Sequence, residues 1–87
     1  MAAGIKVIAQ ISLTQTAAVL SALPGYNGAV IQADTGNAGT VAVGDSALQL
    51  HKLTAGKSVE IYGDTPQNIY VKSSLLTGDK ANVILLP

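Results

Sequence analysis

The sequence predicts an all-β fold, a single small β-sandwich of jelly-roll-like or Greek-key type with about six to eight short strands over residues 1–87. Short segments with apolar residues at alternate positions follow one another along the whole chain. Gly, Asp, Asn or Pro marks a turn between them about every 8 to 12 residues. No internal repeat, charge block or low-complexity linker interrupts this series, so we expect one domain.

The first strand is predicted at residues 5–13, where apolar and polar residues alternate over nine positions. A period of two is typical of a strand with one buried face. Residues 14–25 are expected to form an irregular connection. The spacing of their apolar residues leaves a short helix open, which Pro24 would end.

Residues 28–33 and 40–43 are predicted to be the two strands of a hairpin. The turn between them is rich in Gly and Asn, and Gly36, Asn37 or Gly39 can take a positive φ there without strain. The second strand then closes at Gly44 and the residues that follow it.

Four more strands are predicted in the rest of the chain, at residues 48–51, 58–62, 69–72 and 81–86. Pro66 lies in a turn, since a residue without an N–H is excluded from a central ladder. The last strand has apolar residues at the consecutive positions Leu85 and Leu86. Either both of its faces are covered within the domain, or it lies against a partner.

The composition predicts a thin aliphatic core. Apolar residues make up 48% of the chain, but its only aromatic residues are three tyrosines, and the mean hydropathy is +0.40. A domain of this size cannot bury all of that apolar surface alone. We therefore expect part of it to be buried between copies, in a homo-oligomer for which a trimer is favoured.

The charge pattern argues against nucleic acid as a partner. Five lysines, no arginine and five acids are spread evenly along the chain, so no basic cluster is available to replace counterions on phosphate. There is no cysteine for disulfides or thiol chemistry. No apolar run approaches the roughly 18 residues of a membrane span, and no export signal is visible. We expect a soluble protein made in a cytoplasm.

No motif predicts catalysis. Gly56-Lys57-Ser58 resembles the end of a phosphate-binding loop, but His51 stands where the first Gly of that loop is required. As the only histidine, His51 has no partner at a spacing typical of zinc sites or catalytic triads. Ser46 lacks the second Gly of a nucleophile elbow. We predict no catalytic, cofactor-binding or metal-binding residue and a protein that is not an enzyme.

Four acids lie beside Gly or Thr in predicted turns, where a short carboxylate accepts backbone N–H groups: Asp34, Asp45, Asp64 and Asp79. Turn formation accounts for all four. The alternative is that several such loops converge at one end of the sandwich and hold a calcium ion.

An ordered series of phrases runs through most of the chain: Asn37-Ala-Gly-Thr-Val-Ala-Val-Gly-Asp-Ser, Leu53-Thr-Ala-Gly-Lys-Ser-Val-Glu-Ile, Asn68-Ile-Tyr-Val and Asn82-Val-Ile-Leu-Leu. In order and spacing it resembles small β-sandwich virion structural proteins of tailed bacteriophages. The resemblance implies a capsid decoration (cement) protein, a head-fibre base, or a neck or tail component. It implies no catalytic residues.

We therefore expect a non-enzymatic structural protein on the capsid surface of a bacteriophage virion, made in the cytoplasm of the bacterial host. Its expected function is to bind and stabilise the assembled head as a decoration protein. The expected partners are the major capsid protein or other virion proteins, and further copies of the chain. The alternatives are a neck- or tail-associated structural protein, or a small glycan- or receptor-binding module.

The predicted interface consists of apolar and aromatic residues that are expected not to be needed for the core: Leu20, Leu23, Tyr26, Tyr70, Leu85 and Leu86. A tyrosine combines a flat apolar face with a hydroxyl at low entropic cost, which suits subunit contacts or a ligand-binding strip. Strand-edge pairing and apolar burial across subunit boundaries would then hold many copies together.

Overall fold

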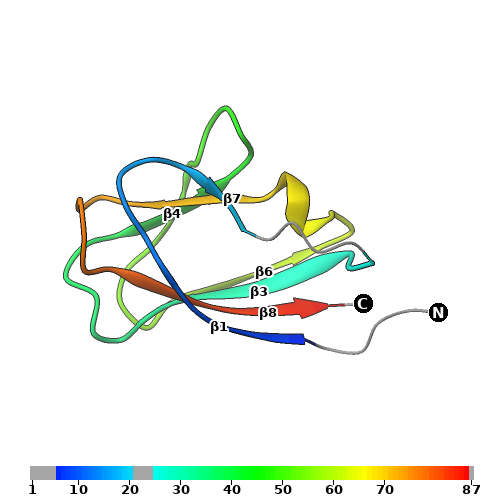
Figure 1. The fold of residues 1–87 in the computed structure, drawn as a ribbon, viewed down its shortest axis with the longest axis horizontal. Helices are drawn as coiled ribbons and strands as arrows, with labels where there is room; N and C mark the ends of the chain where they lie inside the picture. Colours follow the sequence, from blue (N-terminus) through cyan, green and yellow to red (C-terminus); the bar gives the residue numbers. More distant parts are fainter. Residues whose placement is uncertain (1–5, 21–24, 87) are drawn as a thin grey trace.

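The computed structural model describes residues 6–20 and 25–86, which form two four-stranded antiparallel sheets (Figure 1). Sheet A has the strand order β1-β8-β3-β6, and sheet B has the order β2-β7-β4-β5. The strands are β1 (Lys6–Ser12), β2 (Ala18–Val19), β3 (Gly28–Ala33), β4 (Val41–Gly44), β5 (His51–Leu53), β6 (Ser58–Tyr62), β7 (Tyr70–Ser73) and β8 (Lys80–Leu86). One 3₁₀ turn, η1 (Pro66–Asn68), is the only helical element within these ranges. The predicted all-β sandwich is confirmed.

The connectivity is that of a jelly roll. Consecutive strands lie in opposite sheets at every connection except β4–β5. The neighbouring pairs β1–β8, β2–β7, β3–β6 and β4–β5 nest inside one another, as two interlocked Greek keys require. Each sheet is thus assembled from strands that are distant in the sequence.

The predicted hairpin between residues 28–33 and 40–43 is wrong. Strand β3 pairs with β6 and β8 in sheet A, whereas β4 pairs with β5 and β7 in sheet B. The turn exists, but it carries the chain from one sheet to the other. Turn residues specify a reversal of direction, and they do not specify which strand the returning segment joins.

The first strand does not alternate without interruption. Val7 lies opposite Ile84 and Ile11 lies opposite Ala81, with a register shift between Ile8 and Ile11. Ala81 is fully buried and Ile84 is half-buried on the other face of β8. A β-bulge inserts one extra residue into a strand and shifts its register, so the pairing of β1 with β8 is not continuous across Lys6–Ser12.

Residues 14–20 contain a short strand, β2, and no helix. The backbone N–H of Leu20 donates to the carbonyl of Ile69 at 2.7 Å, and Ala18 and Val19 pair with Val71 and Tyr70 on β7. Pairing with β7 gives hydrogen-bond partners to backbone groups that would have none in a single helical turn. This explains why a strand forms here.

The core between the sheets is aliphatic, as the composition predicts. Its largest fully buried apolar side chains are Ile31, Leu85, Val41, Val71 and Val83. Alanines at 29, 33 and 81 are completely buried on the adjacent strands β3 and β8. Tyr26 is the aromatic residue that packs against this cluster from its margin.

The glycines of the 34–40 turn do not use the positive φ that they could adopt. Among the described residues, positive φ values occur at Gly25, Gly56, Gly63 and Gly78, so the turn forms without one at Gly36, Asn37 or Gly39. Gly39 is needed for close packing, because a Cβ there would lie 2.6 Å from Asp79 Oδ2 and 2.5 Å from Ser74 Oγ.

Replacing Leu85 and Leu86 one at a time tests which face of β8 is buried in the core. Leu85 is completely buried, while Leu86 is half-buried on the other face of β8. We expect Leu85→Ala to lower the free energy of unfolding by about 2–5 kcal/mol through lost burial and a residual cavity. The matched change Leu86→Ala should cost about 1 kcal/mol. Urea unfolding of both variants checks this, and equal losses would contradict the assignment of Leu85 to the core.

Candidate binding surface

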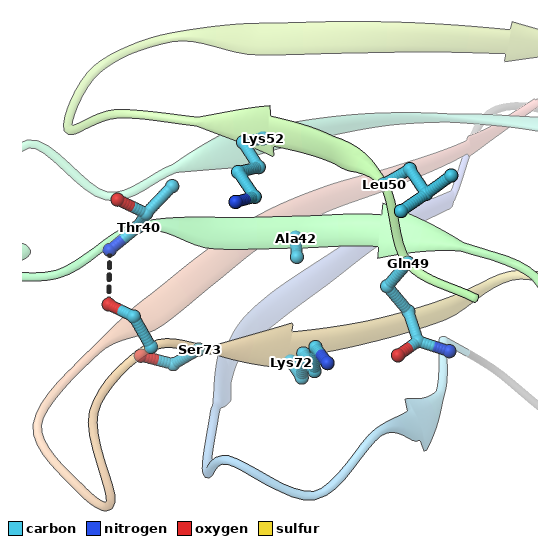
Figure 2. A pocket seen from close by; sticks show the side chains of 8 residues that line it. Thr40, Ala42, Gln49, Leu50, Lys52, Lys72 and Ser73 are labelled. Carbon is cyan, nitrogen blue, oxygen red and sulfur yellow. Dashed lines mark hydrogen bonds between the residues drawn. The ribbon is translucent and has the colours of Figure 1, made fainter.

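A shallow depression of about 370 Å³ lies on the outer face of sheet B, over strands β7, β4 and β5 (Figure 2). It is lined by Thr40, Ala42, Gln49, Leu50, Lys52, Lys72, Ser73 and Ser74. No aspartate or glutamate is among these lining residues. We call this feature the Ala42 depression.

Two lysines flank the floor of the Ala42 depression. Ala42 on β4 lies directly opposite Lys52 on β5 and Lys72 on β7. Residues opposite one another in a ladder point to the same face, so the three side chains form one row across the sheet, as Figure 2 shows. Within the described part of the chain, neither ammonium group has a hydrogen bond or an ion pair.

One wall of the depression is the loop between β4 and β5, which Asp45 shapes. Its Oδ1 accepts the N–H groups of Ala47 and Leu48, each at 2.8 Å. The Asp45 N–H donates to the Leu48 carbonyl at 3.0 Å, and Gln49 Nε2 donates to the Asp45 carbonyl at 2.6 Å. The local role predicted for Asp45 is confirmed, and these two N–H donors lower the pKa of its carboxyl from the ordinary 3.8.

This compact loop explains why the strand predicted at residues 48–51 begins only at His51. A Cβ at Gly44 would collide with the Leu48 carbonyl oxygen, so the loop folds back directly onto the end of β4. Leu48 and Leu50 are left 61% and 73% exposed, and Leu50 stands at the rim of the depression. Their alternation with polar residues resembles a half-buried strand, although neither faces the core.

The opposite wall is held by main-chain and hydroxyl contacts between the ends of β4 and β7. Ser74 Oγ accepts the Thr40 N–H at 2.9 Å, the bond drawn in Figure 2. The Ser74 N–H donates to the Thr40 carbonyl, also at 2.9 Å. This wall is therefore a fixed part of the sandwich.

Beneath this wall, the buried carboxylate of Asp79 joins the 34–40 turn to the end of β7. Asp79 is 1% exposed. Its Oδ1 accepts the N–H groups of Ala38 and Gly39 at 3.1 and 3.3 Å, and its Oδ2 accepts the Ser73 hydroxyl at 2.7 Å. Its carbonyl accepts the Leu13 N–H at 2.9 Å. The sequence predicts that Asp79 lies in a turn and binds backbone N–H groups. Two of its partners lie about 40 residues away in the sequence, which no local pattern reveals.

Asp34 also combines a local and a distant role. Its Oδ2 accepts the Gly36 N–H at 3.1 Å, as expected for a turn. Its Oδ1 accepts Gln10 Nε2 at 2.9 Å and Asn82 Nδ2 at 3.2 Å. Polar groups on this part of sheet A thus bind one another.

The structure separates the predicted interface residues into several environments. Leu20 and Leu85 are core residues, 4% and 0% exposed. Tyr26 is half-buried against the core, and Tyr70 and Leu86 are half-buried on outer faces. Leu23 lies outside the described residues. Tyr26, Tyr70 and Leu86 are therefore the described members of this set that remain partly exposed, and their role in an interface stays a prediction.

The most exposed large apolar side chains are others, namely Leu48, Leu50, Tyr62 and Leu76, followed by Val19 and Leu75. Tyr62 donates a hydrogen bond to the Glu60 carboxylate on the same edge strand, and this bond raises the pKa of the Tyr62 hydroxyl. Leu75 and Leu76 stand between turn-forming residues, which is the one sequence signal that could have placed them at the surface.

Residues 6–20 and 25–86 contain no group of three or more His, Cys, Asp or Glu residues arranged to hold a metal ion. This part of the chain also contains no helix with the length and apolarity needed to cross a membrane. His51 and Ser46 are both exposed, on β5 and in the β4–β5 loop.

Replacing Asp79 should destabilise the fold strongly. We expect Asp79→Ala to lower the free energy of unfolding by about 3 kcal/mol, because buried N–H and O–H donors lose their acceptor. The matched control is Asp64, an exposed acid bonded to Asn68 Nδ2 at 3.2 Å. Asp64→Ala should change the free energy of unfolding by at most about 0.5 kcal/mol. Thermal and urea unfolding test the pair. Similar effects for both would contradict the assigned role of Asp79.

The carboxyl of Asp45 should titrate below 3.8 in the folded protein. A folded-state pKa below the unfolded value means that this group stabilises the fold above the unfolded pKa. That contribution is lost as the pH falls through the folded pKa. NMR titration of the Asp45 carboxyl carbon, in folded and in urea-unfolded protein, measures both values. Equal values, or a higher one in the folded state, would show that the loop bonds do not favour the carboxylate.

Comparisons with known proteins were made for the whole chain. No family model, curated protein or solved structure matches it. The surface itself offers an apolar floor between two ammonium groups, neither of which has a partner among residues 6–20 and 25–86.

Proposed function

We propose that this chain is a non-enzymatic structural protein of a bacteriophage virion, a decoration protein that binds and stabilises the assembled head. The observation that carries the proposal is the jelly-roll connectivity of its two sheets. Jelly rolls recur in viral capsid domains, where a small rigid sandwich presents loops and faces to its neighbours. The ordered phrases from Asn37 to Leu86 resemble phage virion proteins and support the same proposal.

The loop of residues 74–79 has the properties of an attachment point. Leu76 is 70% exposed and Leu75 is 38% exposed. The loop is held firmly, since the Leu75 N–H donates to Ser73 Oγ at 2.9 Å and Asp79 closes its other end. An exposed apolar pair on a fixed loop loses little conformational entropy when a partner covers it.

The major capsid protein, other virion proteins and further copies of the chain are the proposed partners, with a trimer favoured. The short edge strands β2 and β5 of sheet B leave little backbone for uncontrolled pairing. Contacts through loops and faces, repeated over many copies, would supply the cohesion.

A small glycan- or receptor-binding module is the second candidate, because jelly rolls also form lectin domains. The observation that favours it is the Ala42 depression, in which hydroxyl, amide and ammonium groups surround a small apolar floor. Neck or tail attachment remains a variant of the first proposal, with a different partner on the particle.

Co-sedimentation tests the proposal directly. Purified chain is mixed with shells lacking it, from the phage whose genome carries the gene, and light scattering gives its oligomeric state. We expect a discrete oligomer that pellets at a fixed copy number per shell. A chain that stays in the supernatant at all concentrations would exclude decoration, and saturable binding to a glycan array would support the second candidate.

A matched pair of variants examines the attachment loop. Leu76→Asp places a charge on an exposed apolar site, and Thr77→Asp places the same charge on its exposed polar neighbour. We expect both to keep the circular dichroism of the unmodified protein. Leu76→Asp should reduce shell occupancy about 10-fold or more, since a buried unpaired charge is costly, and Thr77→Asp should leave it nearly unchanged. Equal occupancy for the two would remove this loop from the contact.

A further inference from the structure

We propose that the Ala42 depression binds an acidic segment of a partner protein, through carboxylates that pair with Lys52 and Lys72. The proposal rests on the chemistry of the depression alone. It holds whether or not the chain decorates a shell, and its test uses no virion.

The first argument is charge. Lys52 and Lys72 face outward in one row with Ala42, and no acid lines the depression. Neither ammonium has a partner among the described residues. This chain has equal numbers of acidic and basic residues, so two unpaired cations on one face form a local positive site that an anion would complement.

The opposite face of the sandwich shows the contrast. On sheet A, Asn82 Nδ2 donates to Gln32 Oε1 at 3.3 Å and to Asp34 Oδ1 at 3.2 Å. Gln10 Nε2 also donates to Asp34 Oδ1. The polar groups there hydrogen-bond to one another. The ammonium groups of the two lysines have no such partner among the described residues and can bind a ligand.

The second argument selects carboxylates over a single phosphate or sulfate ion. Compact oxyanion sites commonly use free backbone N–H groups or the fork of an arginine, with any lysine adding a point charge. The chain has no arginine, and Ala42 lies on a strand that is paired on both sides. The depression therefore offers two separated point charges on flexible stems.

The third argument is spacing. Lys52 and Lys72 are two strands apart, which places their backbones roughly 9.5 Å from each other. Acidic residues at alternate positions of an extended segment point to one side and lie roughly 6.5–7 Å apart. The flexible lysine side chains can bring the two ammonium groups to the spacing of the two carboxylates. The apolar floor of Ala42, with Leu50 at the rim, suits the aliphatic part of such a segment.

The experiment is an NMR titration of ¹⁵N-labelled full-length protein with a capped hexapeptide containing Glu-Val-Glu, and with its Gln-Val-Gln counterpart. We expect saturable shifts for residues 40–44, 50–53 and 72–74 with the first peptide, at about millimolar affinity, and none of comparable size with the second. Added salt should weaken the binding, as expected for exposed ion pairs.

Matched charge variants make the test specific. The double variant Lys52→Gln/Lys72→Gln should bind the acidic peptide about 10-fold or more weakly. The control Lys57→Gln/Lys80→Gln removes two exposed lysines elsewhere and should bind within about 2-fold of the unmodified protein. Spectra without peptide establish that both variants are folded.

Several results would overturn the proposal. If both double variants lose the same affinity for the acidic peptide, the binding is a nonspecific charge effect. Absence of localised shifts at millimolar peptide would exclude the site. Sodium sulfate that produces the same localised shifts, at equal or higher affinity and matched ionic strength, would assign the depression to a free oxyanion. In that last case the two lysines would still bind, but not a protein segment.

Discussion

The buried carboxylate of Asp79 is the interaction on which the rest of this structure depends. In a jelly roll almost every connection crosses between the sheets, so the loops at each end must be joined to one another if the sheets are to keep their positions. Asp79 does this by binding the 34–40 turn and β7 while its own carbonyl accepts from Leu13. A fully bonded acid among buried groups is rigid, because any displacement leaves a polar atom without a partner.

This rigidity extends to the surface features. Ser73, bonded to Asp79, also accepts the N–H of Leu75 and thereby fixes the base of the exposed 74–79 loop. Ser73 and Ser74 form one wall of the Ala42 depression, and the loop closed by Asp45 forms the other. Both proposed contacts, the apolar loop and the lysine pair, are thus preorganised by polar bonds of the scaffold. Preorganisation lowers the entropic cost of binding, which matters most for a small domain with few contacts.

The polar side chains on the two outer faces of the sandwich differ in whether they have hydrogen-bond partners. On sheet A, Gln10, Gln32, Asp34 and Asn82 bind one another. On sheet B, Lys52 and Lys72 stand beside Ala42 without a partner among the described residues. A small side chain between two long cations leaves a hollow, and a hollow with unpaired charge is suited to recognition. The difference directs the search for a partner to sheet B.

The class of fold, the positions of most strands and the aliphatic nature of the core follow from the amino-acid sequence alone. Each depends on local information: alternation along β6, short apolar runs at β3 and β8, turn residues between the strands, and a composition poor in aromatics. Tertiary structure decided the pairing. The 34–40 turn looks the same whether it closes a hairpin or crosses between sheets, and Leu48 and Leu50 alternate as a buried strand would, yet lie in an exposed loop. The partners of Asp79 and the row of Lys52, Ala42 and Lys72 also come from separate strands, so only the folded chain brings them together. Non-local contacts of this kind leave no periodic signal along the chain, because they are set by which strands become neighbours.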